Sequence, residues 1–272
     1  MRLVVANLRK LIRRPASYVT LALVAALLVL VYASLIITAR VSTDPSAALA
    51  TRSIITFPNA WVTVLELILG VASFLALAVA GAVAGSEWSW GTLKAAVARG
   101  ESRGGYQVTM LAGVIIAIIV GLLVLYLVGL VISIVGAFVL GQSLDAVTDP
   151  DGFGALPEAL ARSSLALTLY ASFGYAVATV ARSQIAGIAV AIGVYFVEGI
   201  GRFFASEILQ WSPFGAAEAV TSAGGEVSLG SGPGAVTLHQ LGDPLAAVVT
   251  SIWIVVAIVV TIAFTQRAEI GG

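Results

Sequence analysis

The chain has 272 residues, of which 60% are hydrophobic and only 10% are charged, and its formal net charge is zero. A soluble domain is about 25% charged, so the composition excludes an ordinary soluble globular protein. The chain has no Cys, one His and no G-x-x-x-x-G-K-[S/T] motif, which excludes disulfides, Cys- or His-based metal clusters and an ATP-binding loop.

Six apolar segments are each long enough to cross a membrane, whose core of ~30 Å requires about 20 mostly apolar helical residues. We expect spans at residues 17–39, 60–85, 108–141, 162–181, 184–201 and 244–265. The third segment corresponds to about 51 Å of helix, which predicts a tilted span with candidate bends at Gly129 and Gly136. The sequence therefore predicts an all-α polytopic membrane protein, with residues 1–272 as a single transmembrane domain.

The amino-terminal segment, residues 1–15, is predicted to contain an amphipathic helix on the membrane surface. Its apolar face comprises Val4, Val5, Leu8, Leu11 and Ile12, and its basic face comprises Arg2, Arg9, Lys10, Arg13 and Arg14. Pro15 separates this helix from the first span. The alternative is a basic orientation signal with no further role.

Two carboxylates are predicted to lie inside spans, where charge is costly. Glu66 lies roughly 9 Å below the outer end of the second span, and Glu198 lies at a similar level in the fifth, with Arg202 at i+4 as a partner. Each belongs to a stripe of mostly small residues, which let helices pack closely. The stripes comprise Glu66, Gly70, Ser73, Leu77, Gly81 and Ala84, and Gln184, Gly187, Ala191, Val194, Glu198 and Arg202. The alternative is structural: outward snorkelling, or a buried pair with Arg52 or Arg202.

The segment between the second and third spans, residues 86–105, contains a predicted short amphipathic helix at residues 92–99. Gly91 precedes this helix and Gly100 ends it. A helix held at the membrane surface between two spans suits docking by a cytoplasmic partner. The alternative is an ordinary connector.

The last outer loop, residues 202–243, is predicted to hold short helices at residues 203–211 and 214–221. Residues 224–234 are glycine-rich and are expected to be flexible. Because we expect no strand or helix beside it, the Gly-Ser-Gly-Pro-Gly run is not a dinucleotide-binding fingerprint.

The basic residues predict that both termini are cytoplasmic, because Lys and Arg are enriched on that side. In this orientation the inner residues are Arg2, Arg9, Lys10, Arg13, Arg14, Lys94, Arg99, Arg103, Arg182 and Arg267, and the outer ones are Arg40, Arg52, Arg162 and Arg202.

The loop at residues 86–105 resembles that of ABC-2-type transporter permeases. The resemblance rests on Glu87, Gly91-Thr92-Leu93-Lys94 and Ser102-Arg103. It extends to the amino-terminal helix, the six spans, the tight Ala181-Arg182-Ser183 turn and Ser212-Pro213 in the outer loop. One departure is Met110, where family members often carry a Lys.

This resemblance implies a permease subunit that is not itself an enzyme. In the family this loop is the coupling helix, which implies an ATPase-coupling site of Glu87, Gly91, Thr92, Leu93, Lys94, Arg99, Ser102 and Arg103. In the family, spans two and five line the subunit interface and the transport path, and the resemblance implies a path here that includes Glu66, Gly70, Ser73, Gln184, Gly187, Ala191 and Glu198.

The implied partners are a separate ATP-binding subunit, which holds ATP and Mg, and a second permease copy or a paralogue. The implied cargo is a lipid, peptide, glycan or drug-like molecule, exported across a bacterial cell (inner) membrane. We expect no cofactor in this chain and no nucleic-acid partner.

Two other functions remain as alternatives. An ion-coupled secondary carrier would use Glu66 or Glu198 to bind a proton, and its halves are commonly repeats, but residues 1–141 and 162–265 show no evident similarity. An intramembrane enzyme would use both acids as a pair, but no nucleophile or metal-ligand set accompanies them.

Overall fold

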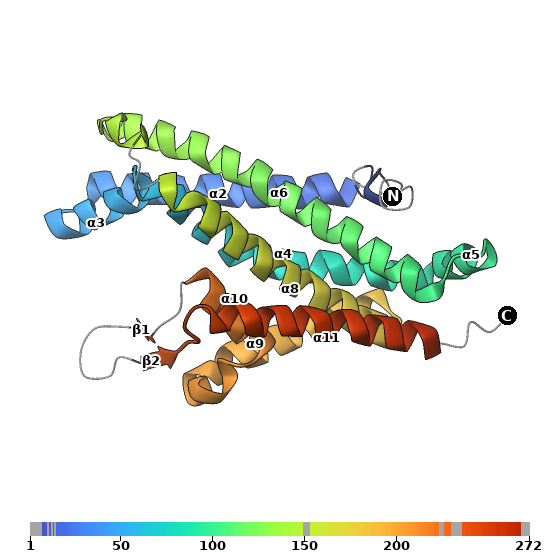
Figure 1. Cartoon of the computed structure of the whole chain (residues 1–272). Coiled ribbons are helices and arrows are strands. Elements are labelled where there is room, and N and C mark those ends of the chain that lie inside the picture. The colour runs from blue at the N-terminus through green and yellow to red at the C-terminus, as the bar shows by residue number, and fades with distance from the viewer. Residues whose placement is uncertain are drawn as a thin grey trace. The chain divides into compact units, whose positions relative to one another are not determined.

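Six long helices form most of the protein. The computed structural model describes residues 7–9, 11, 13, 15–148, 153–222, 226–229 and 236–267. The long helices are α2 (Pro15–Val41), α4 (Ala60–Ser89), α6 (Arg103–Val139), α8 (Leu156–Ala181), α9 (Gln184–Leu209) and α11 (Leu245–Arg267) (Figure 1). All six are long and apolar enough to cross a membrane, which confirms the predicted spans and indicates a multi-pass membrane protein.

Short elements connect the long helices. They are α3 (Pro45–Ile55), α5 (Thr92–Ala98), the 3-10 turn η1 (Asp145–Thr148), α10 (Pro213–Thr221) and the strands β1 (Glu226–Leu229) and β2 (Val236–His239). The two strands form an antiparallel hairpin in which Glu226 lies opposite His239. The predicted amino-terminal helix at residues 2–14 lies largely outside the described residues, of which residues 7–9 and 11 are helical.

The segment at residues 202–243, between the last two long helices, differs from its prediction in two ways. The predicted helix at residues 203–211 is present only after a kink at Ala205 (φ −144°, ψ 46°), which divides α9 into two helical segments, the second of which ends at Leu209. Strands β1 and β2 flank residues 230–235, where we expected none, and the Gly-Ser-Gly-Pro-Gly run lies outside the described residues. The predicted helix at residues 214–221 is confirmed as α10.

Helix α3 was not predicted, although its sequence carries a start signal. Asp44 is the N-cap, its Oδ1 accepts hydrogen bonds from the Ser46 hydroxyl (2.7 Å) and backbone N–H (2.8 Å), and Pro45 occupies the first turn. Asp followed by Pro is a typical helix start. Because both bonds favour the ionised form, they hold the pKa of the Asp44 carboxyl below its ordinary value.

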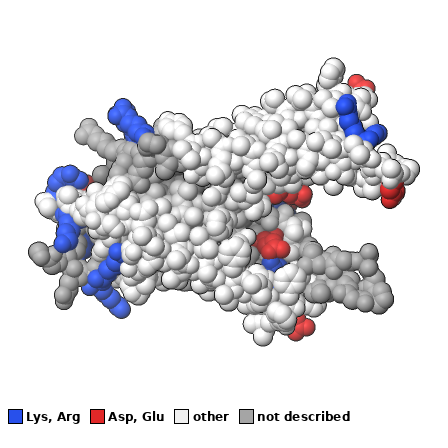
Figure 2. Space-filling view, turned by 180° about the vertical axis from the view of Figure 1, so that it is seen from behind, with Lys and Arg blue, Asp and Glu red and all other residues white. Residues whose placement is uncertain are grey.

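The described chain divides into two compact units. Unit 1 comprises Met1–Ile12, Ser73–Ile118 and Ser164–Gly272, and unit 2 comprises Arg13–Ala72 and Ile119–Ser163. In unit 1, α5 and the end of α11 lie at one end, and α10 and the hairpin lie at the other (Figure 1). On the face shown in Figure 2, Lys and Arg side chains gather at the end that carries α5.

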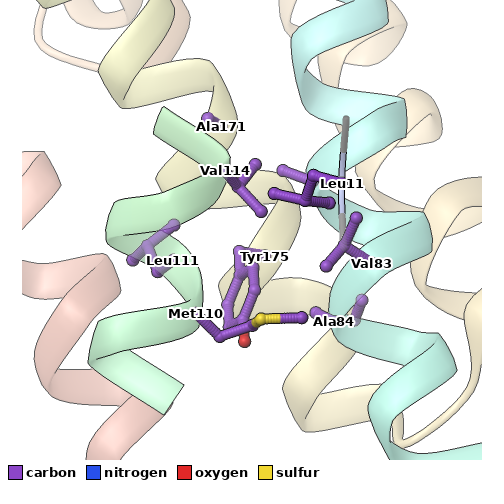
Figure 3. Packing of buried hydrophobic residues seen from close by; sticks show 10 residues of the cluster. Leu11, Val83, Ala84, Met110, Leu111, Val114, Ala171 and Tyr175 are labelled. Carbon is purple, nitrogen blue, oxygen red and sulfur yellow. The ribbon is translucent and has the colours of Figure 1, made fainter. Parts of the chain in front are cut away.

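Tyr175 lies at the centre of a core cluster in unit 1. It is fully buried and packs with side chains from α4, α6 and α8 and with Leu11 of the amino-terminal segment (Figure 3). Met110, the departure noted from the sequence, is fully buried in this cluster. A Lys at this position would require a buried partner, so the apolar side chain suits the observed packing.

Close backbone contacts bring α4, α8 and α9 together in unit 1. A Cβ on Gly174 would lie 2.2 Å from the Leu77 carbonyl oxygen, and one on Gly187 would lie 2.5 Å from the Ala178 Cα. These two positions therefore require glycine, as is common where membrane helices cross closely.

Unit 2 is held by contacts between α2, α4 and α6. Tyr32 accepts a hydrogen bond from the Ser133 hydroxyl (2.9 Å), and the Tyr126 hydroxyl donates to the Trp61 carbonyl (3.0 Å). Helix α6 runs uninterrupted through the predicted bending point Gly129. A Cβ there would lie 2.4 Å from Val64 Cγ1, so this glycine admits a neighbouring side chain.

Candidate functional site

The segment between α4 and α6 folds as predicted into a short helix, α5. Gly91 (φ 65°) precedes it and Gly100 (φ 91°) follows it, both in the left-handed region that favours glycine. The buried face carries Leu93 and Ala96, which pack with Tyr106 of α6. The exposed face comprises Lys94, Ala95, Ala98 and Arg99. The helix therefore presents a small, basic surface at the end of unit 1.

Glu87 joins three helices at this site. It is fully buried at the end of α4, and its Oε2 accepts hydrogen bonds from the Thr92 hydroxyl of α5 (2.5 Å) and the Tyr106 hydroxyl of α6 (2.6 Å). A buried carboxylate is costly unless it is hydrogen-bonded, and hydrogen bonds to an ionised acceptor are among the stronger ones. Glu87 thereby fixes α5 against both long helices.

Ser102 and Arg103 lie at the start of α6. The Ser102 hydroxyl accepts a hydrogen bond from the Gly105 N–H (3.2 Å), as expected near a helix amino terminus. The Arg103 guanidinium donates to the Gln266 carbonyl in the last turn of α11 (3.5 Å). The structure thus brings all the predicted coupling residues to one end of unit 1.

The predicted path residues of α9 form its packed face. Gly187, Ala191, Glu198 and Arg202 are buried, and a Cβ on Gly85 would lie 2.3 Å from the Gln184 Cα. Most of the predicted stripe therefore packs closely, whereas Val194 of the same stripe is 39% exposed.

Glu198 caps helix α10. Its Oε1 accepts hydrogen bonds from the Ser212 hydroxyl and from the Gly215 N–H (2.6 Å). The amino end of a helix attracts a carboxylate because its first N–H groups have no partner within the helix.

Arg202 interacts electrostatically with Glu198 but does not form the predicted ion pair with it. Its ion-pair partner is Glu218 of α10, because the carboxylate of Glu198 is held by the amino end of that helix. Gln240 also reaches Glu218 (3.5 Å). The sequence reasoning missed Glu218 and Gln240, although Ser212-Pro213 marked the start of α10.

Glu66 has different surroundings. It belongs to unit 2, is exposed, and lines a hollow of ≈ 490 Å³ with Ser53, Asn59 and Thr63. On the same helix, Gly70 has open space around it, and Ser73 is buried in unit 1. Glu66 thus lies at an open hollow with both polar and apolar lining residues, whereas the carboxylate of Glu198 is occupied by α10.

Two threonine hydroxyl groups of α8 bond to carbonyl groups one turn earlier in the same helix. Thr168 donates to the Ser164 carbonyl (2.7 Å) and Thr179 to the Tyr175 carbonyl (2.9 Å). Within the described ranges, no group of three or more His, Cys, Asp or Glu side chains is placed to hold a metal ion.

No model of a known protein family matches the chain, and no curated protein has a similar sequence. The fold therefore defines the class. Six helices of spanning length and composition indicate a multi-pass membrane protein.

Proposed function

We propose that this protein is the permease subunit of an ATP-driven exporter of the ABC-2 type. Helix α5 is the surface on which a separate ATP-binding chain docks, and ATP and Mg are held by that chain. The proposal rests on the loop that resembles this family and on the shape that the loop adopts. In the proposed orientation, α5 and both termini are cytoplasmic, as the basic residues favour.

The buried carboxylate of Glu87 is the observation that carries the proposal. Because Glu87 bonds to both α5 and α6 from the end of α4, a displacement of α5 is passed to two spanning helices. A flexible connector would absorb the same displacement. This connection is what a transporter requires in order to convert a movement of its ATPase into a rearrangement of the spans.

The exposed face of α5 suits a protein partner. Ala95 and Ala98 allow close approach, and Lys94 and Arg99 add positive charge beside them. The partner is therefore expected to present an acidic rim around a groove for α5, since complementary charges favour association.

The remaining parts follow from the family resemblance. The protein would act as a dimer with a second copy or a paralogue in a bacterial cell membrane. Glu66 and the packed stripe of α9 would belong to the path for an amphipathic substrate. The exposed position of Glu66 in its hollow supports this role for Glu66 more directly than the capped position of Glu198 supports one for Glu198.

Substitution of the exposed face of α5 tests the docking. The tagged full-length protein is purified from its native membranes, the co-purifying chains are identified, and ATP hydrolysis by the complex is measured. We expect a co-purifying chain with a G-x-x-x-x-G-K-[S/T] motif, and we expect Ala95→Trp to remove both that chain and the ATPase activity. Ala50→Trp is the matched control, because Ala50 is an exposed alanine of the short helix α3.

Two outcomes would contradict the proposal. One is an ATP-binding chain that is retained equally by both variants with unchanged hydrolysis. The other is transport that persists under ATP depletion but collapses with the proton gradient, which would favour an ion-coupled carrier.

A further inference from the structure

An apolar groove of ≈ 430 Å³ lies among α8, α9 and α11 in unit 1. Its lining includes Val180 and Ala181 of α8, Val190 of α9, and Val256, Ala257 and Val260 of α11. Every lining side chain is aliphatic or aromatic, and all three helices are long and apolar enough to span a membrane. Water and polar ligands gain nothing in such a groove, whereas a hydrocarbon chain does.

The groove reaches the basic end of unit 1. Val180 and Ala181 are the last two residues of α8, and Val190 lies near the beginning of α9. This end also carries α5 and the end of α11 (Figure 1), and Lys and Arg side chains gather there (Figure 2).

Two positively charged features lie between the groove and this end of unit 1. Arg267 lies seven residues after Val260, on the same stripe of α11 and about 10.5 Å farther along the helix. It is exposed and forms no ion pair with the described residues. Ser183, the N-cap of α9, lies seven residues before Val190, so the electropositive first turn of α9 lies on the stripe that leads into the groove.

We propose that this groove binds one acyl chain of an anionic phospholipid, whose phosphate lies between Arg267 and the start of α9. The groove supplies the apolar contact and the end of the unit supplies the positive charge, as in basic pockets between membrane helices that hold anionic headgroups. This inference requires only that the protein spans a membrane, and so it does not depend on the proposed transport function.

A pair of adjacent valines tests the acyl-chain site. The full-length protein is purified in detergent and titrated with phosphatidylglycerol or with phosphatidylcholine of the same acyl chains, and bound lipid is counted by native mass spectrometry. We expect Val260→Trp, which fills the groove, to weaken phosphatidylglycerol binding at least tenfold. Val259→Trp is the control, because Val259 is exposed and lies outside the lining.

The charge is tested separately. We expect wild-type protein to prefer phosphatidylglycerol over phosphatidylcholine about fivefold or more, and Arg267→Gln to abolish that preference while the groove still binds both lipids. Arg9→Gln removes one exposed positive charge elsewhere and should leave the preference intact. Thermal unfolding of each variant confirms that it is folded.

Equal binding by the Val260→Trp and Val259→Trp variants would overturn the acyl-chain site. An unchanged preference for phosphatidylglycerol in Arg267→Gln would overturn the assignment of the headgroup. Loss of ATPase docking in the α5 variants bears on neither result, so the two proposals fail independently.

Discussion

Glu87 and Glu198 are both buried acids that accept hydrogen bonds from hydroxyl groups, but they hold different short helices. Glu87 joins α5 to the ends of α4 and α6, and Glu198 holds the amino end of α10. In each case a carboxylate near the end of a long helix fixes a short helix beside it. The position of each short helix therefore depends on a carboxylate as well as on apolar packing.

Tyr106→Phe removes one of the two hydroxyl donors to Glu87 and should destabilise the protein. Loss of a hydrogen bond to a buried group costs about 1–3 kcal/mol, and the site has no exposure to water that could replace the donor. The measurement is the free energy of unfolding in detergent. Tyr18→Phe is the control, because Tyr18 is 58% exposed. Equal stability of the two variants would show that the Tyr106 hydroxyl does not hold Glu87.

Asp44 should make the start of α3 sensitive to acid. Its pKa is lowered by hydrogen bonds from Ser46, so the capping contribution is complete above the ordinary carboxyl pKa of about 3.9 and is lost as the pH falls through the lowered value. An NMR titration should place the midpoint of Asp44 below that of a peptide Asp. In Asp44→Asn, which keeps an acceptor oxygen, the Ser46 amide signal should not change with pH. A titration midpoint of Asp44 at the ordinary carboxyl value in the wild-type protein would contradict the capping interaction.

At the scale of elements, α9 and α10 are joined by an ion pair between a buried Arg and a half-exposed Glu. Arg202 is 5% exposed, and its partner Glu218 lies on α10. Because α9 kinks at Ala205, the chain turns back and brings α10 against the same face of α9. The contact between α9 and α10 thus requires both the kink and the pair.

Glu218→Leu should destabilise the contact between α9 and α10 more than a double substitution of Arg202 and Glu218 does. The single variant leaves a buried guanidinium without its counter-ion. We expect this to cost about 3 kcal/mol, which is the low end of the range for a broken buried ion pair, because Glu218 itself is half exposed. Arg202→Met together with Glu218→Leu should recover most of the loss in the free energy of unfolding. Glu207→Leu, which removes an 82% exposed acid, should change stability by less than about 1 kcal/mol. A double variant less stable than Glu218→Leu would contradict this account.

The crossing of α4 and α8 should depend on Gly174. Gly174→Ala forces a methyl group against the Leu77 carbonyl, and such overpacking typically costs about 1–3 kcal/mol. A methyl group on Gly193 of α9 would meet no atom within 4 Å, so Gly193→Ala should be neutral or slightly stabilising. The measurement is the thermal unfolding temperature of the two variants in detergent. Destabilisation by Gly193→Ala but not by Gly174→Ala would show that the crossing of α4 and α8 does not depend on Gly174.

The long helices were predictable from the sequence because an uncharged apolar run of spanning length has few other structures open to it. Their ends were less predictable: α8 begins at Leu156 rather than at residue 162, because Arg162 ended the uncharged run in the sequence although it lies inside the helix with Glu158. The strands escaped detection because each has only four residues, too few for an alternating pattern to stand out.

The candidate site was likewise predictable only in part. Helix α5 could be predicted because Gly91, Gly100 and the amphipathic run between them are local signals. The bonds from Ser212 and Gly215 to Glu198 span 14 and 17 residues and require the kink at Ala205. No local pattern marks that kink, so Arg202 was assigned to Glu198, its neighbour at i+4, rather than to Glu218.

At the scale of the whole molecule, orientation is the prediction that the proposed function most needs. The chain has no Cys, so a single introduced thiol can be labelled without background. A membrane-impermeant maleimide should label Ala47→Cys on α3 in intact cells and Ala98→Cys on α5 only in inverted vesicles, since α4 crosses the membrane between them. Both side chains are exposed, so the opposite pattern would place α5 outside and exclude a cytoplasmic ATPase.

Helix α6 has a consequence for the membrane itself. Its 37 residues extend about 55 Å, whereas a bilayer with its headgroup regions is about 40–45 Å thick. A tilt of roughly 40° from the membrane normal is needed to keep both ends of α6 within the interfaces, and this is the upper end of the range for spanning helices. A thicker, sterol- or sphingolipid-like bilayer would let α6 stand straighter, so the lipid around the protein helps to set the angle between its longest helix and the membrane normal.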